Sequence, residues 1–351
     1  MRVGVDTGGT FTDVVAADGR VIKVLSTRDD PGDAVREGLR RLGTVTVLAH
    51  GTTVATNAVL ERRGADLVLV TTEGCADLIE IARQDRPSLY DIDVDRPEPL
   101  VPWGRRFEVP GRLDATGAVV ARIDPALIPL LPPGAPVAVC LLHADLNPAH
   151  EQAVASDLER RGHAVTCSHE VSPEMREYER TVTTVIDAFV KPTVSGYLSR
   201  LAGVAPEIFV MTSAGGLLPL ADAATRPSSL LLSGPAGGVR AGAEAATAAG
   251  FADAVTFDMG GTSTDVCLVL GGSPSPASER EVGGFPVRKP SLDIHTIGAG
   301  GGSIAWTDSG GALRVGPRSA GADPGPACYG RGGMEPTVTD ADLVAGRIPP
   351  D

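Results

Sequence analysis

Long apolar segments are missing from this sequence of 351 residues, although 42% of its residues are hydrophobic. No stretch of 18 or more apolar residues occurs, so we expect no membrane-spanning helix. The apolar run that follows Arg2 ends at Asp6, which makes it too short for a signal peptide. We therefore expect a cytoplasmic protein that is long enough for two domains with a real core.

Cysteine pairs and lysines are also scarce. The five cysteines are scattered without a CxxC pair, so we expect neither a zinc site nor a disulfide framework. Lysine occurs only at positions 23, 191 and 289, and the formal net charge is −13. This charge argues against nucleic acid or an acidic membrane surface as a partner. An acidic protein that binds an anionic ligand must use local backbone N–H groups and a metal ion.

Strand and helix patterns alternate along the chain and predict an α/β fold. We expect strands over 3–5, 14–15, 21–24, 45–49, 67–70, 137–142, 208–211 and 255–257. We expect helices over 31–42, 53–63, 148–161, 236–249 and 340–346. Residues 84–122 and 298–333 are expected to be long loops, the first with short strands and the second ordered and functional. The stretch 172–192 is predicted to be a hinge between two domains, 1–175 and 176–351.

An eight-residue turn motif occurs twice. Residues 6–13 read DTGGTFTD and residues 258–265 read DMGGTSTD, so six of the eight positions are identical. Each copy follows a β-branched strand and leads into another strand. A single Gly-Gly turn between strands is usually only a hairpin. The duplicate, with both acids and both threonines in register, is much harder to explain in that way.

The residue types of this duplicated turn suit the binding of phosphate and a divalent cation. Paired glycines let a backbone approach an anion closely, and threonine hydroxyls can donate hydrogen bonds to phosphate oxygens. Carboxylates at strand ends can hold hydrated Mg²⁺ or orient a water, so Asp6 and Asp258 are the candidate metal ligands and catalytic residues. The other candidate ATP-binding residues of the two motifs are Gly8, Gly9, Thr10, Thr12, Asp13, Gly260, Gly261, Thr262, Thr264 and Asp265. Neither a P-loop nor a Rossmann fingerprint is present.

Further motifs extend a resemblance over the whole chain. They are His50–Ala58 (HGTTVATNA), Ser172–Arg180 (SPEMREYER), Ser233–Gly238 (SGPAGG), Leu292–His295 (LDIH), Gly298–Ser303 (GAGGGS) and Gly321–Gly330 (GADPGPACYG). With the two turns, they resemble the hydantoinase A/5-oxoprolinase family of ATP-dependent cyclic-amide hydrolases, to which acetone and acetophenone carboxylase subunits are related. Asp187 and Phe189 depart from the family pattern, which more often has Asn and Tyr there.

This resemblance implies a fold and a chemistry. The fold would be that of the actin and sugar-kinase ATPases, with two ribonuclease H-like domains and a cleft between them. The cofactors would be ATP and Mg²⁺, the substrate a hydantoin or 5-oxoproline, and the partner a B-type hydantoinase subunit. Transfer of the γ-phosphoryl group to the ring carbonyl oxygen would activate the amide. Family members usually run to about twice this length, judged by ordinary domain sizes, so the second domain is expected to be incomplete at its C-terminus.

Candidates on the substrate side rest on weaker patterns. His50 lies between a strand and a helix and could carry a proton as a catalytic residue, or could be a hydrogen-bonded turn histidine. Gly300, Gly301 and Gly302 could approach the cofactor closely, or form a plain loop. For the other residues the patterns favour an ordinary structural role at least as much. Thr52 and Thr53 would cap a helix, and Cys328 would be an inert thiol. Asp293 and His295 share one face of a strand and could reach a metal or substrate or be structural, and Glu177, Glu179 and Arg180 would form a salt-linked hinge face.

Three alternatives stay open at this point. A small-molecule kinase on the same fold would release a stable phosphorylated product, and a carboxylase relative would phosphorylate an enolate or bicarbonate. A remnant without turnover would bind triphosphate weakly and without preference for adenine.

Overall fold

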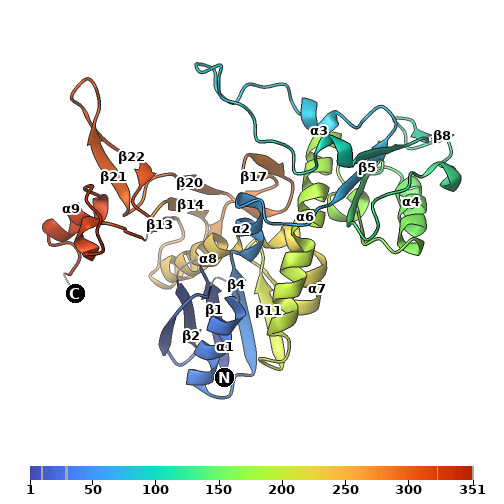
Figure 1. Ribbon diagram of the computed structural model, residues 1–351. Helices are drawn as coiled ribbons and strands as arrows, with labels where there is room; N and C mark the ends of the chain where they lie inside the picture. The colour runs from blue at the N-terminus through green and yellow to red at the C-terminus, as the bar shows by residue number, and fades with distance from the viewer. Residues whose placement is uncertain (9–10, 28–30, 322, 350–351) are drawn as a thin grey trace. The chain divides into compact units, whose positions relative to one another are not determined.

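The computed structural model describes residues 1–351 except for 9–10, 28–30, 322 and 350–351 (Figure 1). The chain forms two compact units. The first contains residues 1–234 and 277–291, and the second contains residues 235–276 and 292–351. These units divide at other positions than the boundary predicted after residue 175, because the helix that begins there belongs to the core of the first unit.

The first sheet of the first unit has the strand order β12–β11–β4–β1–β2–β3. Its strands are β1 (Arg2–Thr7), β2 (Phe11–Ala16), β3 (Val21–Leu25), β4 (Val47–Thr52), β11 (Glu207–Met211) and β12 (Leu217–Pro219). Strands β1, β2 and β3 form an antiparallel meander, whereas β4 and β11 continue the sheet in parallel from β1. Helix α1 (Pro31–Leu42) packs on β1, β2 and β3 and confirms the helix predicted over 31–42.

The second sheet of the first unit is parallel, with the order β10–β9–β5–β6. Its strands are β5 (Val68–Thr72), β6 (Arg106–Val109), β9 (Val137–Cys140) and β10 (Val165–Cys167). Every residue of β5 and β9 is buried, as expected for strands inside a parallel sheet. Helix α4 (Ala149–Arg160) packs on β9 and β10 (Figure 1), close to the helix predicted over 148–161.

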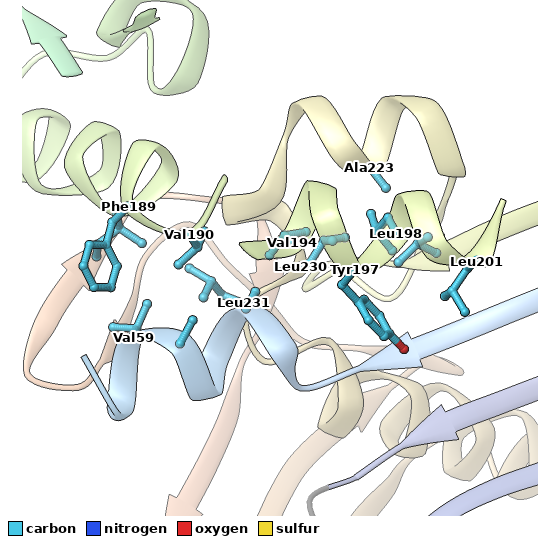
Figure 2. Packing of buried hydrophobic residues seen from close by; sticks show 14 of the residues in the cluster. Val59, Phe189, Val190, Val194, Tyr197, Leu198, Leu201, Ala223, Leu230 and Leu231 are labelled. Atoms are coloured by element: carbon cyan, nitrogen blue, oxygen red, sulfur yellow. The ribbon is translucent and has the colours of Figure 1, made fainter. Parts of the chain in front are cut away.

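Helix α6 (Glu177–Leu201) joins these two sheets into one unit. It contacts β9 and α5 (Ser168–Val171), and also α2 (Val54–Leu60), α7 (Leu220–Thr225) and η3 (Pro227–Leu230). Figure 2 shows its apolar side chains, among them Phe189, Val194 and Leu198, packed with Val59 and Leu231. Most of the stretch 172–192, where a hinge is predicted, lies in this continuous helix, and its residues 179–190 are all buried.

Arg180 holds the start of this helix in place. Its guanidinium is fully buried and donates hydrogen bonds to the Asp145 carboxylate at 2.6 Å and to the carbonyl oxygens of Leu141 at 2.9 Å and Glu174 at 3.0 Å. A buried charge with these partners is a structural anchor, not an ordinary surface ion pair. The predicted salt-linked face thus lies in the interior of the first unit.

The second unit is built on a sheet in which β14 pairs with β13, β15 and β20. Its main elements are α8 (Ser233–Ala248), β13 (Ala254–Met259), β14 (Thr264–Leu270), β15 (Ser273–Pro274), β20 (Ile294–Ile297), β21 (Ser303–Thr307), β22 (Leu313–Ser319) and α9 (Val338–Val344). Ala236 and Val239 of α8 pack with Cys267, Leu292 and Ile294 in a small core. A capping box of Thr337 and Asp340 begins α9.

Short elements complete the chain. They are α3 (Leu78–Ile81), η1 (Trp103–Arg105), β7 (Arg112–Leu113), β8 (Val119–Ala121), η2 (Pro125–Leu127), β16 (Pro276–Ala277), β17 (Arg280–Val282), β18 (Phe285–Val287), β19 (Ser291–Leu292) and η4 (Ala327–Tyr329). The short strands expected within 84–122 are confirmed by β6, β7 and β8. Among the residues with described placement, no helix combines the length and apolarity needed to cross a membrane.

Candidate functional site

The first turn motif forms the hairpin that its sequence predicts. Strands β1 and β2 pair antiparallel, with Asp6 opposite Asp13 and Thr7 opposite Thr12. The Gly8 N–H closes the turn by donating to the Phe11 carbonyl oxygen at 3.0 Å. The two predicted ligands Gly9 and Thr10 lie outside the described residues.

The Asp6 carboxylate lies beside two glycines at the end of β1. Gly51 on the neighbouring strand β4 is paired with Asp6, and a Cβ added there would lie 2.9 Å from Asp6 Oδ1. A Cβ added to Gly234 would lie 3.9 Å from the same oxygen. Asp6 itself is exposed. The missing side chains therefore leave room around a solvent-facing carboxylate, as a hydrated cation would require.

Thr12 and Asp13 are occupied within the first unit. Thr12 is fully buried, and its hydroxyl lies 3.0 Å from that of Ser26, which itself donates to the Gly8 carbonyl oxygen at 2.8 Å. Because the Ser26 proton is committed to Gly8, Thr12 is the donor in the first contact. Asp13 forms an ion pair with Lys23 at 3.0 Å. In this structure Thr12 therefore helps to hold the turn, and its donation to phosphate stays a prediction.

The second motif folds in the same way within the second unit. Asp258 lies opposite Asp265 on β13 and β14, and the Gly260 N–H donates to the Ser263 carbonyl oxygen at 2.8 Å. Asp258 is exposed, and a Cβ added to Gly238 would lie 3.7 Å from its Oδ2 atom. Both copies of the motif therefore present an exposed carboxylate next to a glycine. The tip residues Gly260, Gly261 and Thr262 are exposed as well.

Thr264 and Asp265 are occupied in the same manner as their counterparts in the first motif. Thr264 is buried and donates its hydroxyl proton to the Ala299 carbonyl oxygen at 2.5 Å. Asp265 accepts a hydrogen bond from the Thr296 hydroxyl at 2.6 Å. Phosphate donation by Thr264 likewise stays a prediction. A direct contact of Asp13 or Asp265 with ATP stays a prediction.

The glycine loop at 298–303 packs on the second turn. The Gly301 and Gly302 N–H groups donate to the carbonyl oxygens of Gly260 at 2.9 Å and Gly261 at 2.6 Å. A Cβ added to Gly300 would lie 2.6 Å from the Gly260 oxygen, which real Cβ atoms essentially never do. The glycines at 300 and 302 are thus required by contact with the turn backbone. Binding of the cofactor by Gly300, Gly301 and Gly302 stays a prediction.

His50 lies inside β4, not in the predicted turn, and its side chain is fully buried. Its Nε2 atom is 2.7 Å from the hydroxyl oxygen of Tyr197 on α6. Figure 2 shows this hydroxyl directed toward the strand. Burial lowers the pKa of His50 to about 4, so the imidazole is uncharged at neutral pH. This placement favours the hydrogen-bonded structural role over the predicted role of proton carrier.

The remaining weak candidates also receive structural roles. The Thr53 hydroxyl does not cap α2 but donates to the Thr7 carbonyl oxygen at 3.3 Å, and the Thr52 hydroxyl accepts from the Val54 N–H at 3.2 Å. Asp293 lies between β19 and β20 rather than on one strand with His295, and its Oδ2 atom is 3.8 Å from His295 Nε2.

Two family models match this chain. The model "Hydantoinase/oxoprolinase N-terminal region" covers residues 2–162, and the model "Hydantoinase/oxoprolinase" covers residues 180–351. The chain belongs to the hydantoinase/oxoprolinase family. The junction between the two family models lies near the predicted domain boundary, whereas the compact units of the structure divide later in the chain.

Several relatives in this family carry functional names. Caprolactamase subunit alpha of Pseudomonas jessenii is 36% identical in an alignment that covers 99% of this chain and 54% of that protein. 5-Oxoprolinase 1 of Arabidopsis thaliana is 36% identical, over 100% of this chain and 32% of that protein. The acetophenone carboxylase gamma subunit of Aromatoleum aromaticum is 36% identical, over 99% of this chain and 53% of that protein. The chain therefore spans about half the length of most of these relatives, or less.

A solved structure has the same α/β fold. The crystal structure of ATP-dependent caprolactamase from Pseudomonas jessenii superposes with a TM-score of 0.86 at 33% sequence identity, covering 99% of this chain and 55% of that chain. The mixed α/β class predicted from the strand and helix patterns is thus confirmed.

One cluster of metal-ligating residue types occurs among the described residues of this family member, on α4, β10 and α5 of the first unit. Ligand atoms of Glu151, Cys167 and His169 lie within 4.8 Å of one another. Glu151 is fully buried, and its oxygens accept from the Ser168 hydroxyl, the Leu141 and His169 N–H groups and His169 Nδ1, at 2.6–2.9 Å. Burial, together with nearby carboxylates, raises the pKa of the Cys167 thiol. A satisfied carboxylate and a protonated thiol form a structural network, so we assign no metal here.

Sequence reasoning missed a cavity of about 700 Å³ in the first unit. It is lined by part of the segment 82–100, which the sequence indicated only as an elaborated loop. Its other walls come from α3, the start of α6 and the β17–β18 hairpin. The sequence feature that could have indicated this cavity is the high content of Pro, Arg and Asp between residues 84 and 99, which is more than a simple turn requires.

Proposed function

We propose that this chain is the A-type component of an ATP-dependent enzyme that hydrolyses cyclic amides, and that its two turns bind the phosphates of ATP. The observation that carries this proposal is the repeated hairpin, in which a strand ends at an exposed carboxylate beside a glycine that leaves space. The family assignment and the ATP-dependent, amide-hydrolysing relatives support the chemistry. We also propose that each turn belongs to a ribonuclease H-like domain of the actin and sugar-kinase type.

Asp6 and Asp258 have the donor chemistry for Mg²⁺. Magnesium prefers hard oxygen ligands and keeps several of its waters, so it needs open space around one or two carboxylates. Gly51 leaves that space at Asp6, and Gly238 leaves it at Asp258. Asp6 and Asp258 would hold the ion, which would offset the negative charge of the phosphates. The exposed Gly261 and Thr262 backbone N–H groups and the Thr262 hydroxyl are the donors that we propose for phosphate in the second turn.

The proposed reaction makes a poor electrophile reactive. The ring carbonyl oxygen attacks the γ-phosphorus, and ADP leaves with the electron pair of the broken P–O bond. Water then adds to the activated carbon, the C–N bond breaks, and the nitrogen takes a proton as the ring opens to an acyl phosphate. A second water releases inorganic phosphate and leaves a carboxylate. Catalysis of such a transfer consists mainly of positioning and charge neutralisation, which the two turns can supply.

Phosphate release from ATP tests this proposal. The chain, with and without a B-type subunit, should release phosphate faster when hydantoin, a lactam or 5-oxoproline is added. Asp6→Asn and Asp258→Asn should each lower the stimulated rate by about 10²-fold or more. Each removes a carboxylate that would hold the Mg²⁺ ion, and this ion offsets the negative charge of the phosphates during the transfer. Asp18→Asn, at an exposed acid paired with Arg20, is the matched control and should leave the rate unchanged. Absence of stimulation in the presence of the partner would contradict the proposal.

The prediction that both turns act on one triphosphate has its own test. If they do, the double variant Asp6→Asn/Asp258→Asn should lose little more activity than either single variant, since groups that act as a unit are non-additive. Multiplicative losses would count against joint action.

A carboxylase is the second candidate, because the acetophenone carboxylase subunit matches this chain with the same 36% identity as the hydrolase relatives. It predicts ATP consumption that depends on bicarbonate and a ketone, with no stimulation by ring amides. A kinase on the same fold would instead accumulate a stable phosphorylated product. A remnant without turnover would show no preference for ATP over pyrophosphate in calorimetry.

A further inference from the structure

The cavity of about 700 Å³ in the first unit has the size and wall composition of a small-molecule site. Ligand sites in proteins typically enclose about 300–1,000 Å³ and combine apolar walls with a few convergent polar groups. None of the turn residues described above lines this cavity. The cavity and the proposed triphosphate site therefore have no lining residue in common.

One wall of the cavity is apolar and comes from a single face of α6. Tyr178, Val182 and Val185 follow one another at helical spacing and all line the cavity. Phe285 of β18 and Leu100 of the connecting segment complete this surface. These side chains offer contacts for the carbon atoms of a compact ring.

The polar part of the wall is an ion pair between Arg83 and Glu179. Arg83 Nε donates to Glu179 Oε1 at 2.8 Å, and Arg83 Nη2 donates to Oε2. Glu179 is 5% exposed. Burial alone would raise its pKa, but the hydrogen bonds from Arg83 hold the pKa below its ordinary value, so the carboxylate is ionised. Two of the five guanidinium N–H donors are used, and each carboxylate oxygen can accept again.

This pair presents a donor and an acceptor side by side. The amide of a small ring is held in the cis form, so its N–H and C=O groups lie on the same edge. An open-chain amide is trans and directs these groups to opposite sides. A ring amide can therefore donate its N–H to Glu179 and accept from Arg83 at the same time.

The charge of the lining opposes an anionic ligand. Seven carboxylates and three guanidinium groups line the cavity. Two of the carboxylates, Glu80 and Glu279, form ion pairs with Arg106 and Arg288, which lie outside the lining. The remaining groups leave an excess of two negative charges around the ligand. A carboxylate attached to the ring would be repelled.

We propose that this cavity binds a neutral cyclic amide through the Arg83–Glu179 pair and selects against ring amides that carry a carboxylate. The choice of a ring amide as the ligand rests on the proposed function. Binding itself needs neither ATP nor the two turns, so the two proposals can fail separately.

Three compounds with the same five-membered ring test the proposal by isothermal titration calorimetry or saturation-transfer NMR on the full chain. 2-Pyrrolidinone should bind. N-methyl-2-pyrrolidinone lacks the N–H and should bind about tenfold or more weakly, because Glu179 loses its donor. 5-Oxoproline should also bind more weakly, and this difference should shrink as salt is added. Equal binding of the N-methyl compound, or tighter binding of 5-oxoproline, would overturn the proposal.

Variants locate the site. The double substitution Arg83→Met/Glu179→Leu removes the pair without leaving a buried charge, and should abolish 2-pyrrolidinone binding. Glu61→Gln/Arg63→Gln removes an exposed pair of the same unit and should change nothing. If the first variant does not fold, Glu281→Gln at an exposed lining position provides a second test. It should improve 5-oxoproline binding relative to 2-pyrrolidinone, and an unchanged ratio would refute charge selection.

Asp6→Asn separates this inference from the proposed function. It should stop ATP hydrolysis and leave 2-pyrrolidinone binding intact. Suppose that a ring amide stimulates ATP hydrolysis but that lactam affinity does not depend on Arg83 and Glu179. This result would refute the cavity as the ring-amide site and would keep the proposed function. Pair-dependent lactam binding without any stimulated hydrolysis would keep the cavity and refute the proposed function.

Discussion

Acid should destabilise this protein through His50, and the effect can be worked out from its surroundings. The side chain is fully buried, and burial lowers its pKa from 6.5 to about 4. Above pH 6.5 the imidazole is neutral in both the folded and the unfolded chain, so it contributes no pH dependence. Between pH 6.5 and 4 only the unfolded chain takes up the proton. As the pH is lowered through this range, the free energy of unfolding should fall by about 1.4 kcal/mol per pH unit, or about 3 kcal/mol in total.

The assay compares the native chain with His50→Gln, which keeps a polar side chain near Tyr197 but cannot titrate. Urea unfolding followed by circular dichroism at several pH values gives the free energy of unfolding of each protein. Other groups contribute equally to both, so the difference between the two curves isolates His50. We expect the variant to be less stable at pH 7 and to approach the native chain as the pH falls toward 4.

Parallel curves for the two proteins would refute this reasoning. They would mean that His50 takes up its proton equally well in the folded chain, which would restore the role of proton carrier. Histidine NMR gives an independent check, because the signal missing from the His50→Gln spectrum belongs to His50. That signal should stay unshifted between pH 8 and pH 5.5, whereas an ordinary histidine titrates in this range.

Two further substitutions test the contacts of the first unit. Gly51→Ala places a methyl group 2.9 Å from Asp6 Oδ1 and should weaken Mg-ATP binding by about tenfold or more, measured by calorimetry, whereas Gly104→Ala, where nothing lies within 4 Å, should be neutral. Arg180→Met should lower the free energy of unfolding by about 3–5 kcal/mol, because it leaves buried partners unpaired. Arg160→Met should cost about 1 kcal/mol or less, because this arginine is exposed and its partner Asp157 keeps Arg161. Unchanged ATP affinity, or equal costs for the two arginines, would contradict these contacts.

Local sequence patterns were sufficient for the elements that depend on near neighbours. The bounds of α1 follow from an apolar face at helical spacing, and those of α8 and α9 were predicted to within a few residues. The Gly-Gly turns with their flanking β-branched residues predicted both hairpins, and the structure added the pairing of Asp6 with Asp13 and of Asp258 with Asp265. Such features can be predicted from the sequence because the residues that determine them lie within a few positions of one another.

Sequence reasoning failed where a side chain's partner is distant in the chain. The pattern at 172–192 predicts a hinge, because neither the packing of α6 on β9 and β10 nor the burial of Arg180 can be seen from the stretch itself. Thr12 and Thr264 have the same neighbours as a phosphate-binding threonine. Ser26 and Ala299, which lie 14 and 35 positions away, take their protons instead.

The sequence by itself determined the family, the alternation of strands and helices, and the repeated acidic turn, because each of these is written in short runs of residue types. Only the tertiary structure decided that His50 is buried against Tyr197, 147 positions along the chain, and that Arg83 and Glu179, 96 positions apart, meet at the wall of a cavity. Burial and long-range partners depend on how whole elements pack. The free energy of that packing is distributed over many contacts, and no local motif encodes it.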